Sequence, residues 1–302
     1  MPYVRFIIRL IVRVLIVALV LFIALIGVGG ALTYHVVTRQ NAVEDVTPQS
    51  YLLSSYLPLN FTDPSGGEHE GWLLLGLRHA PVIILCHGYD SNRSDLLSLG
   101  TILRDNHFNV YLFNFQGSKA KARFSNLGPR QASDVLAAIE AVSRQPEVNA
   151  KRVGLFGTSV GAYAALAAGE VNPKVKAIVV DSTYQTPEQM FRLQIDRLFG
   201  SSSRLFRVLT DTEFHLLTRG NRSLPMLANL SKLEGTPKLF ISGRDDPVTA
   251  EWTEGVYKQA PPPKQLMVLE HALAGLTAVS EKKDYQEQVL NYFLQNLSLR
   301  AN

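Results

Sequence analysis

One serine in the chain has the surroundings of a nucleophile. Ser159 stands between Gly157 and Gly161 in a G-x-S-x-G pattern, after the apolar run 152–156 and before the alanine-rich run 162–168. This context predicts a strand, a sharp turn and a helix, with the serine on a strained backbone. A Cβ at either glycine would collide with the neighbouring strand or helix. The pattern alone is weak, because composition produces it by chance in on the order of one chain in ten of this length.

A neutral serine hydroxyl needs a base within hydrogen-bond reach, and histidine is suited because it can accept and return a proton near neutral pH. Of the seven histidines, His271 alone follows both the serine and the candidate acids at the end of a predicted strand, 265–269. A carboxylate would hold the imidazole tautomer and stabilise the imidazolium. Asp246 and Asp245 follow one strand and Asp181 follows the strand before it, so three acids are open.

Strands and helices alternate from residue 81 onward, which favours a parallel sheet with right-handed crossovers. Residues 51–76 alternate apolar and turn-forming stretches, which predicts an antiparallel edge. The expected strands are 81–85, 108–115, 152–156, 175–180, 237–242 and 265–269, and the expected helices include 91–104, 131–143, 250–259 and 284–297. The candidate catalytic residues all follow strands, where ligands bind in open α/β sheets.

These motifs together resemble the serine hydrolases of the α/β-hydrolase superfamily. His87 and Gly88 follow a buried strand and precede a helix, as in the first βα turn of that family. The resemblance implies that the backbone N–H groups of Tyr89 and Val160 bind the oxyanion. The resemblance covers residues of about 50 to 298 and points in particular to the membrane-tethered branch that resembles prolyl-oligopeptidase-like esterases and peptidases.

The family's chain order is serine, acid, histidine, and its acid stands three residues after a glycine. Counted from Gly243, this position is Asp246, so the resemblance selects Ser159, Asp246 and His271 as the triad and keeps Asp245 and Asp181 as alternatives. The chain departs from the family at 114–117, where Asn-Phe-Gln-Gly replaces a usual Asp-x-Arg-Gly. That change removes a local ion pair and bears on loop packing rather than on catalytic groups.

The segment 184–232 lacks a predicted strand. Its apolar pattern predicts an insertion with two helices, 187–198 and 204–217. In the family, an insertion here is a cap over the active site. It is rich in arginine, which fits either a lid that meets anionic groups or a solvated face balanced by acids, and the solvated face is the favoured interpretation. The arginines are Arg192, Arg197, Arg204, Arg207, Arg219 and Arg222.

The N-terminal segment predicts a membrane anchor. Residues 14–32 form an uninterrupted apolar run of 19 residues, about 28 Å as a helix and close to the hydrocarbon thickness of a bilayer. Arg5, Arg9 and Arg13 precede it, so the positive-inside rule puts the N-terminus in the cytoplasm and the hydrolase domain outside it. A cleaved signal peptide is the competing interpretation. The expected organisation is an anchor at 1–39, a linker at 40–50 and a hydrolase domain at 51–302.

Composition excludes several classes of function. The four arginines of residues 1–40 account for the excess charge: without them, 26 basic residues match the 26 acidic ones, so no basic surface for nucleic acid is implied. Cys86 is the only cysteine and lies in an apolar run, which is typical of a small buried hydrophobe. Cysteine and histidine spacing typical of a metal site is absent from the sequence, and the reaction calls for no metal or organic cofactor.

The sequence therefore predicts an α/β-hydrolase fold: a mostly parallel central sheet flanked by helices, with a small helical cap, after one N-terminal transmembrane helix. The predicted function is hydrolysis of a carboxylic ester, thioester or amide. The substrate would be a small or lipid-like acyl compound, with peptides as a further class. An acyltransferase with the same triad and a catalytically silent, membrane-tethered binding module are the two rival hypotheses.

Overall fold

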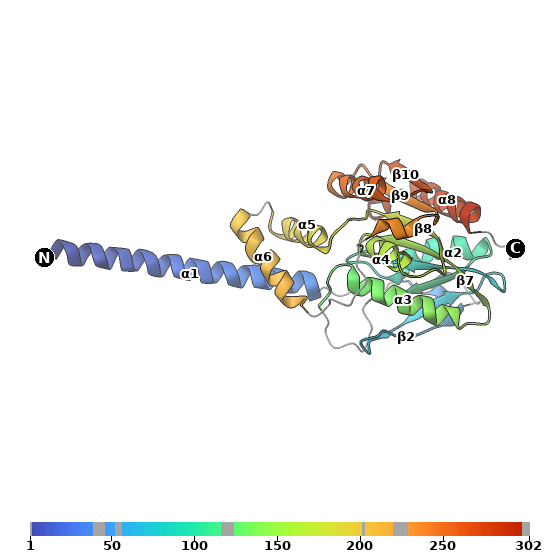
Figure 1. The fold of residues 1–302 in the computed structure, drawn as a ribbon, viewed down its shortest axis with the longest axis horizontal. Helices are drawn as coiled ribbons and strands as arrows, with labels where there is room; N and C mark the ends of the chain where they lie inside the picture. Colours follow the sequence, from blue (N-terminus) through green and yellow to red (C-terminus); the bar gives the residue numbers. More distant parts are fainter. Residues whose placement is uncertain are drawn as a thin grey trace.

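The computed structural model describes residues 2–38, 46–51, 56–115, 124–200, 203–219, 227 and 229–297. Figure 1 shows a long N-terminal helix that projects from a layered domain, with the C-terminus on the far side of that domain. The predicted turn at 116–118 and most of the predicted linker lie outside the described residues. The final residues of that linker are described, and they carry the 3-10 helix η1 (Pro48–Tyr51).

The centre of the domain is a mixed sheet, eight-stranded within the described residues. Its spatial order is β1 (Tyr56–Pro58), β4 (Gly71–Leu74), β6 (Asn109–Phe113), β5 (Ala80–Cys86), β7 (Val148–Thr158), β8 (Val175–Asp181), β9 (Lys238–Gly243) and β10 (Lys264–Leu269). The first two pairings are antiparallel and the others are parallel. A separate hairpin joins β2 (Phe61–Thr62) to β3 (Glu68–His69). The predicted mostly parallel sheet with an antiparallel edge is confirmed.

Helices cover both faces of the sheet because its strands are apolar on both sides. On β5, Val82, Ile84 and Cys86 pack into one core, while Ile83 and Leu85 pack into the other. This is the pattern of a buried strand whose side chains alternate between faces. The first core includes α3 (Pro129–Ser143), α4 (Val160–Gly169) and α7 (Pro247–Gln259), and the second includes α2 (Leu97–Asp105) and α8 (Val279–Asn296).

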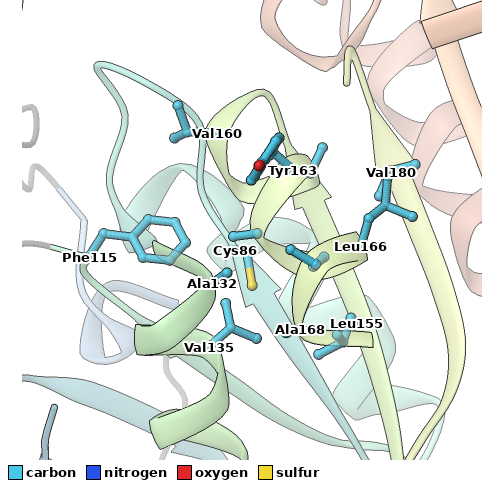
Figure 2. Close-up of a cluster of buried hydrophobic side chains, with 14 of the residues drawn as sticks. Cys86, Phe115, Ala132, Val135, Leu155, Val160, Tyr163, Leu166, Ala168 and Val180 are labelled. Atoms are coloured by element: carbon cyan, nitrogen blue, oxygen red, sulfur yellow. The ribbon is translucent and has the colours of Figure 1, made fainter. Parts of the chain in front are cut away.

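Cys86 is fully buried, as its apolar run predicts. Figure 2 shows its side chain among Val135 of α3 and Leu166 of α4. Burial raises the pKa of the Cys86 thiol, so the reactive thiolate is suppressed and the residue behaves as a small hydrophobe.

The helix expected at 91–104 is divided. Asn92 accepts a hydrogen bond from the N–H of Ser94, and Asp95 accepts one from the N–H of Asn92. This capping box starts the 3-10 helix η2 (Arg93–Leu96), and α2 follows it. The capping oxygens therefore set the start of the helical segment later than the apolar pattern alone does.

The two predicted cap helices are present as α5 (Pro187–Phe199) and α6 (Arg204–Leu217). They pack through stacked aromatic rings: Phe191 lies on Phe214 with centroids 4.5 Å apart, and Phe199 lies on Phe206 at 4.7 Å. The two short remaining 3-10 helices are η3 (Leu230–Leu233) and η4 (Leu273–Gly275).

The predicted N-terminal helix is present as α1 (Pro2–Thr38). Of the helices that the structure describes, α1 is the one that is long and apolar enough to cross a membrane. Its last turns are part of the domain, which differs from the separate tether that the sequence predicts. Val36 and Val37 are fully buried in the first core. Val46 likewise accepts a hydrogen bond from the Ser94 hydroxyl at 2.6 Å. These apolar and polar contacts join the end of the predicted anchor and linker to the fold.

Candidate active site

The turn between β7 and α4 holds Ser159 in a conformation that L-residues rarely adopt. Its φ is 52° and its ψ is −117°, a strained backbone that persists only where surrounding contacts impose it. Those contacts include the hydrogen bond from the Ser159 N–H to the carbonyl oxygen of Asp181, 3.0 Å long. Such strain is typical of functional sites, and it fixes where the serine side chain points.

Two glycines let the strand, turn and helix approach closely. A Cβ on Gly161 would lie 2.2 Å from the carbonyl oxygen of Cys86, and a Cβ on Gly157 would lie 2.2 Å from the carbonyl oxygen of Gly161. Neither neighbour can yield, because both atoms belong to backbone. The G-x-S-x-G spacing is therefore explained by packing between β7, α4 and the end of β5.

Three positive-φ residues follow neighbouring strands at the same edge of the sheet. Besides Ser159 after β7, Asp90 follows β5 with φ 58° and Ser182 follows β8 with φ 54°. All three stand at or just beyond the carboxyl ends of parallel strands. These are three of the six positive-φ residues other than glycine in the described chain, and the other three, His79, His107 and Leu127, stand just before β5, β6 and α3 respectively.

The side chain of Ser159 is half-buried beneath the cap. Its Oγ lies 4.0 Å from Sδ of Met190, a residue of α5 that is 3% exposed. A thioether sulfur is a weak acceptor, so this contact holds the hydroxyl only loosely. Helix α5 therefore covers the candidate nucleophile without a strong competing hydrogen bond.

The predicted oxyanion donors lie on the two turns that meet at the serine. A Cβ on Gly88 would lie 3.5 Å from Cβ of Ser159, so the turn after β5 touches the nucleophile. The N–H of Val160, first in α4, has no intrahelical acceptor and donates to none of the described residues. The hydroxyl of Tyr89 donates to the carbonyl oxygen of Val36 at 3.1 Å, so this turn also contacts α1.

Asp246 is engaged by the cap and by its own helix. One carboxylate oxygen accepts a hydrogen bond from Nη2 of Arg197 on α5 at 2.7 Å. The other accepts from the N–H of Thr249 at 3.3 Å and caps α7. Neither oxygen contacts His271 in the part of the chain that the structure describes.

His271 is paired with a different acid. Its Nδ1 lies 3.4 Å from Oε2 of Glu281 on α8, close enough for electrostatic attraction but without hydrogen-bond geometry. The side chain is 42% exposed, and it forms no hydrogen bond with Ser159 among the described residues. The structure therefore places the three triad candidates at one edge of the sheet but does not join them.

The two alternative acids hold the backbone beside His271. Asp245 accepts a hydrogen bond from the N–H of Ala272 at 3.1 Å, and Asp181 accepts one from the N–H of Leu273 at 3.0 Å. Because Asp181 belongs to β8, the second bond shows that the chain turns back across the strand ends directly after β10.

The carboxylate of Asp181 is fully buried, and burial raises its pKa. Hydrogen bonds oppose that shift: Tyr285 donates its hydroxyl at 2.6 Å and Ser182 donates its own at 2.7 Å. A buried carboxylate with several donors is satisfied in place, which suits a positioning role. Sequence reasoning offered Asp181 only as an alternative acid, because its partner Tyr285 is 104 residues distant.

Three of the five described cap arginines are paired with acids, and Arg204 and Arg219 have no acid partner among the described residues. Besides the Arg197 pair, Arg192 bonds Asp211 at 2.7 Å and Arg207 lies 3.5 Å from Asp196. Arg222 lies outside the described residues.

A second polar cluster was not predicted. Asp63, His69 and Asp134 are buried, with ligand-type atoms within 4.8 Å of one another. Nε2 of His69 lies 3.1 Å from Asp63 and 3.6 Å from Asp134. Asp63 and His69 belong to the β2–β3 hairpin, whereas Asp134 belongs to α3, so the sequence spacing does not show that the three side chains meet. The cluster joins the hairpin to α3.

Comparisons with known proteins agree with this architecture. The chain is 27% identical over 254 residues to the uncharacterized protein YfhR of Escherichia coli O157:H7, covering 80% of this chain and 81% of that one. No protein-family model matches.

Solved structures give the fold. The Pyrococcus furiosus esterase Pf2001 superposes with a TM-score of 0.67 at 19% identity, over 87% of this chain and 99% of that chain. The dienelactone hydrolase of Anabaena variabilis superposes with a TM-score of 0.57 at 16% identity, over 80% and 98% respectively. The architecture of this chain is that of the α/β-hydrolase fold, as its sequence predicts.

Proposed function

We propose that the chain is a serine hydrolase in which Ser159 attacks the carbonyl carbon of an ester, thioester or amide. The observation that supports this most is the strained backbone of Ser159, with φ 52° at the carboxyl edge of the sheet. Strain of this kind costs on the order of 1–3 kcal/mol and is retained where function uses it. The unoccupied N–H of Val160 beside it suits an oxyanion donor.

In the proposed reaction, Ser159 Oγ bonds to the carbonyl carbon while its proton passes to His271. The N–H groups of Tyr89 and Val160 stabilise the oxyanion of the tetrahedral intermediate. His271 then returns the proton to the leaving group as the acyl–oxygen, acyl–sulfur or acyl–nitrogen bond breaks. Water attacks the acyl-enzyme with His271 as base and releases the acid.

This mechanism requires two side-chain contacts to exchange partners, the Arg197–Asp246 ion pair and the contact between His271 and Glu281. Asp246 must leave Arg197, and His271 must leave Glu281, before Asp246 can hold the imidazole beside Ser159. The Arg197 and Asp246 side chains are 53% and 29% exposed, so solvent screens the attraction between them. Catalytic hydrogen bonds are often long in the absence of substrate and form in the complex. A movement of α5 that admits substrate past Met190 would also release Asp246.

The substrate we propose is an ester or thioester with a small or lipid-like acyl group. The structural neighbours named as an esterase and a dienelactone hydrolase favour esters over peptides by analogy of fold. The likeness to prolyl-oligopeptidase-like enzymes keeps amides as a second class to test.

We also propose that α1 spans a membrane, with the N-terminus cytoplasmic and the hydrolase domain outside. Gly29 and Thr33 pack within the fold, and Val36 and Val37 are fully buried. A cleavage just after Ala31 would leave Thr33, Val36 and Val37 in place but would remove Gly29, which packs on Glu213 and Leu209 of α6, so this contact supports retention of the anchor.

One observation favours a second function. Because Ser159 and His271 form no hydrogen bond within the described residues, the chain could be a membrane-tethered binding module that kept the fold without the reaction. A hydrolase would turn over an ester substrate, whereas a binding module would bind the substrate without cleaving it.

The test is hydrolysis by the full chain in detergent micelles of a series of p-nitrophenyl esters with increasing acyl length, beside aminoacyl p-nitroanilides. We expect ester turnover that Ser159→Ala abolishes, with an acyl-enzyme mass on the wild-type chain. Equal turnover by the two chains would show that the activity does not depend on Ser159, and absence of turnover with bound substrate would establish the binding module.

A further inference from the structure

The contact between α1 and α6 occurs within the apolar run of α1. Residues 3–24 of α1 are exposed, whereas Gly29 and Thr33 are buried. A Cβ on Gly29 would lie 3.1 Å from Oε2 of Glu213 and 3.4 Å from Cδ2 of Leu209. The hydroxyl of Thr33 donates to the same Glu213 oxygen at 3.2 Å. Helix α6 thus crosses α1 at a point where the absence of side chains on α1 allows close approach.

This crossing point sets the depth of α6 relative to a membrane. The apolar run 14–32 is about 28 Å long as a helix, close to the hydrocarbon thickness of a bilayer. Gly29 is in the last turn of that run. A helix that packs on Gly29 therefore lies at the boundary between the acyl chains and the headgroups, if α1 spans the bilayer.

The outer face of α6 carries three exposed apolar side chains, together with the exposed polar residues Thr212 and His215. Leu205, Val208 and Leu216 are 60%, 58% and 49% exposed, and their spacing of three and eight residues puts them on one helix face. The buried residues Phe206, Thr210 and Phe214 lie on another face, which packs against α5. Leu198 and Phe199, 45% and 52% exposed, extend the apolar surface at the end of α5.

Figure 1 shows where this surface lies: the connected ends of α5 and α6 stand beside α1 and reach farther toward its N-terminus than the rest of the domain does. Helix α6, which carries these exposed apolar side chains, packs on α1 at Gly29, five residues after the exposed segment 3–24 of α1. Charged residues of α6 such as Arg207 and Asp211 lie on a third face and pair within the hairpin. This is the arrangement of a helix that lies in a membrane interface.

We propose that the α5–α6 hairpin is a second membrane contact, in which Leu205, Val208 and Leu216 insert into the acyl–headgroup boundary of the leaflet that faces the hydrolase domain. The proposal rests on the proposed membrane span of α1 and is independent of the chemistry at Ser159. Helix α5 also carries Met190 over Ser159 and Arg197 onto Asp246. The membrane would therefore contact the same element that covers the candidate nucleophile.

The test uses single cysteines in the full chain with Cys86→Ala, each labelled with an environment-sensitive nitrobenzoxadiazole fluorophore. The sites are Val208→Cys, Val279→Cys as a matched valine that is 85% exposed at the start of α8, and Leu19→Cys in α1. If Cys86→Ala does not fold, Cys86 is retained, because its buried thiol has a raised pKa and resists labelling in the folded chain. Each chain is placed in phosphatidylcholine nanodiscs at one copy per disc, with or without lipids that carry a nitroxide on the acyl chain.

We expect strong nitroxide quenching at positions 19 and 208 and little at position 279. Quenching at 19 with position 208 as unquenched as 279 would overturn the proposal and leave the anchor intact. No quenching at 19 would overturn the anchor and the proposal together. A blue shift of the fluorescence at position 208 without quenching would show that protein covers Leu205, Val208 and Leu216. This result would also contradict a lipid contact.

Discussion

The nucleophile turn and the loops after β9 and β10 are built in opposite ways. Ser159 is fixed by backbone contacts, since Gly157 and Gly161 allow approaches that no other residue permits. Asp246 and His271 are held by partly exposed side-chain pairs with Arg197 and Glu281. Backbone packing permits one arrangement, whereas the solvent-screened Arg197–Asp246 pair and the His271–Glu281 contact, which lacks hydrogen-bond geometry, hold their side chains weakly. One half of the site is therefore preformed, and the other half can rearrange when substrate enters.

The largest effect should come from the acid in the rearranging half. If Asp246 stabilises the imidazolium of His271, Asp246→Asn should lower kcat by about 10⁴-fold, because the amide cannot supply the charge or hold the productive tautomer. Steady-state ester hydrolysis measures this. Asp245→Asn is the matched control, since Asp245 bonds the N–H of Ala272 instead. A large loss in the Asp245 variant with normal activity in the Asp246 variant would assign the acid to Asp245.

The preformed half should not tolerate a single methyl group. In Gly161→Ala, the new Cβ would meet the carbonyl oxygens of Cys86 and His87 at 2.2 Å and 2.6 Å. We expect the free energy of unfolding to fall by at least about 3 kcal/mol, because backbone must move. Urea denaturation followed by circular dichroism in detergent measures it. Gly255→Ala in α7 is the control: with no atom within 4 Å of its added Cβ, it should gain up to about 1 kcal/mol. Equal stability of both variants would contradict the close approach.

The smallest effect should come from freeing Asp246 from the cap. Arg197→Gln removes an exposed pair, so the free energy of unfolding should change by less than about 1 kcal/mol. The kcat for esters should rise modestly, since Asp246 no longer has to leave its partner. Arg192→Gln, on the same helix and equally exposed but paired with Asp211, should leave kcat unchanged. A fall in kcat specific to Arg197→Gln would mean that the pair supports the active arrangement.

Local patterns in the sequence were sufficient for the strands, helices and nucleophile turn. Apolar runs gave the strands from β5 to β10, and the glycines around Ser159 gave the turn. The pairs Arg197–Asp246 and His271–Glu281 were beyond sequence reasoning, because exposed charges choose partners only when the fold places them. The packing of α1 on α6 had one available signal, the small residues Gly29 and Gly30 within an apolar run, since small residues allow helices to approach closely.

Whether the two halves act together is tested most directly by the rate at which a fluorophosphonate probe labels Ser159, with the site located by peptide mass spectrometry. If His271 activates the serine, His271→Ala should slow labelling by at least about 10²-fold, as expected for loss of a general base. His215→Ala removes an exposed histidine of α6 that lies 3.9 Å from Glu188, and should label at the wild-type rate. Labelling of Ser159 at an equal rate in the wild-type and His271→Ala chains would show that the serine does not depend on this histidine.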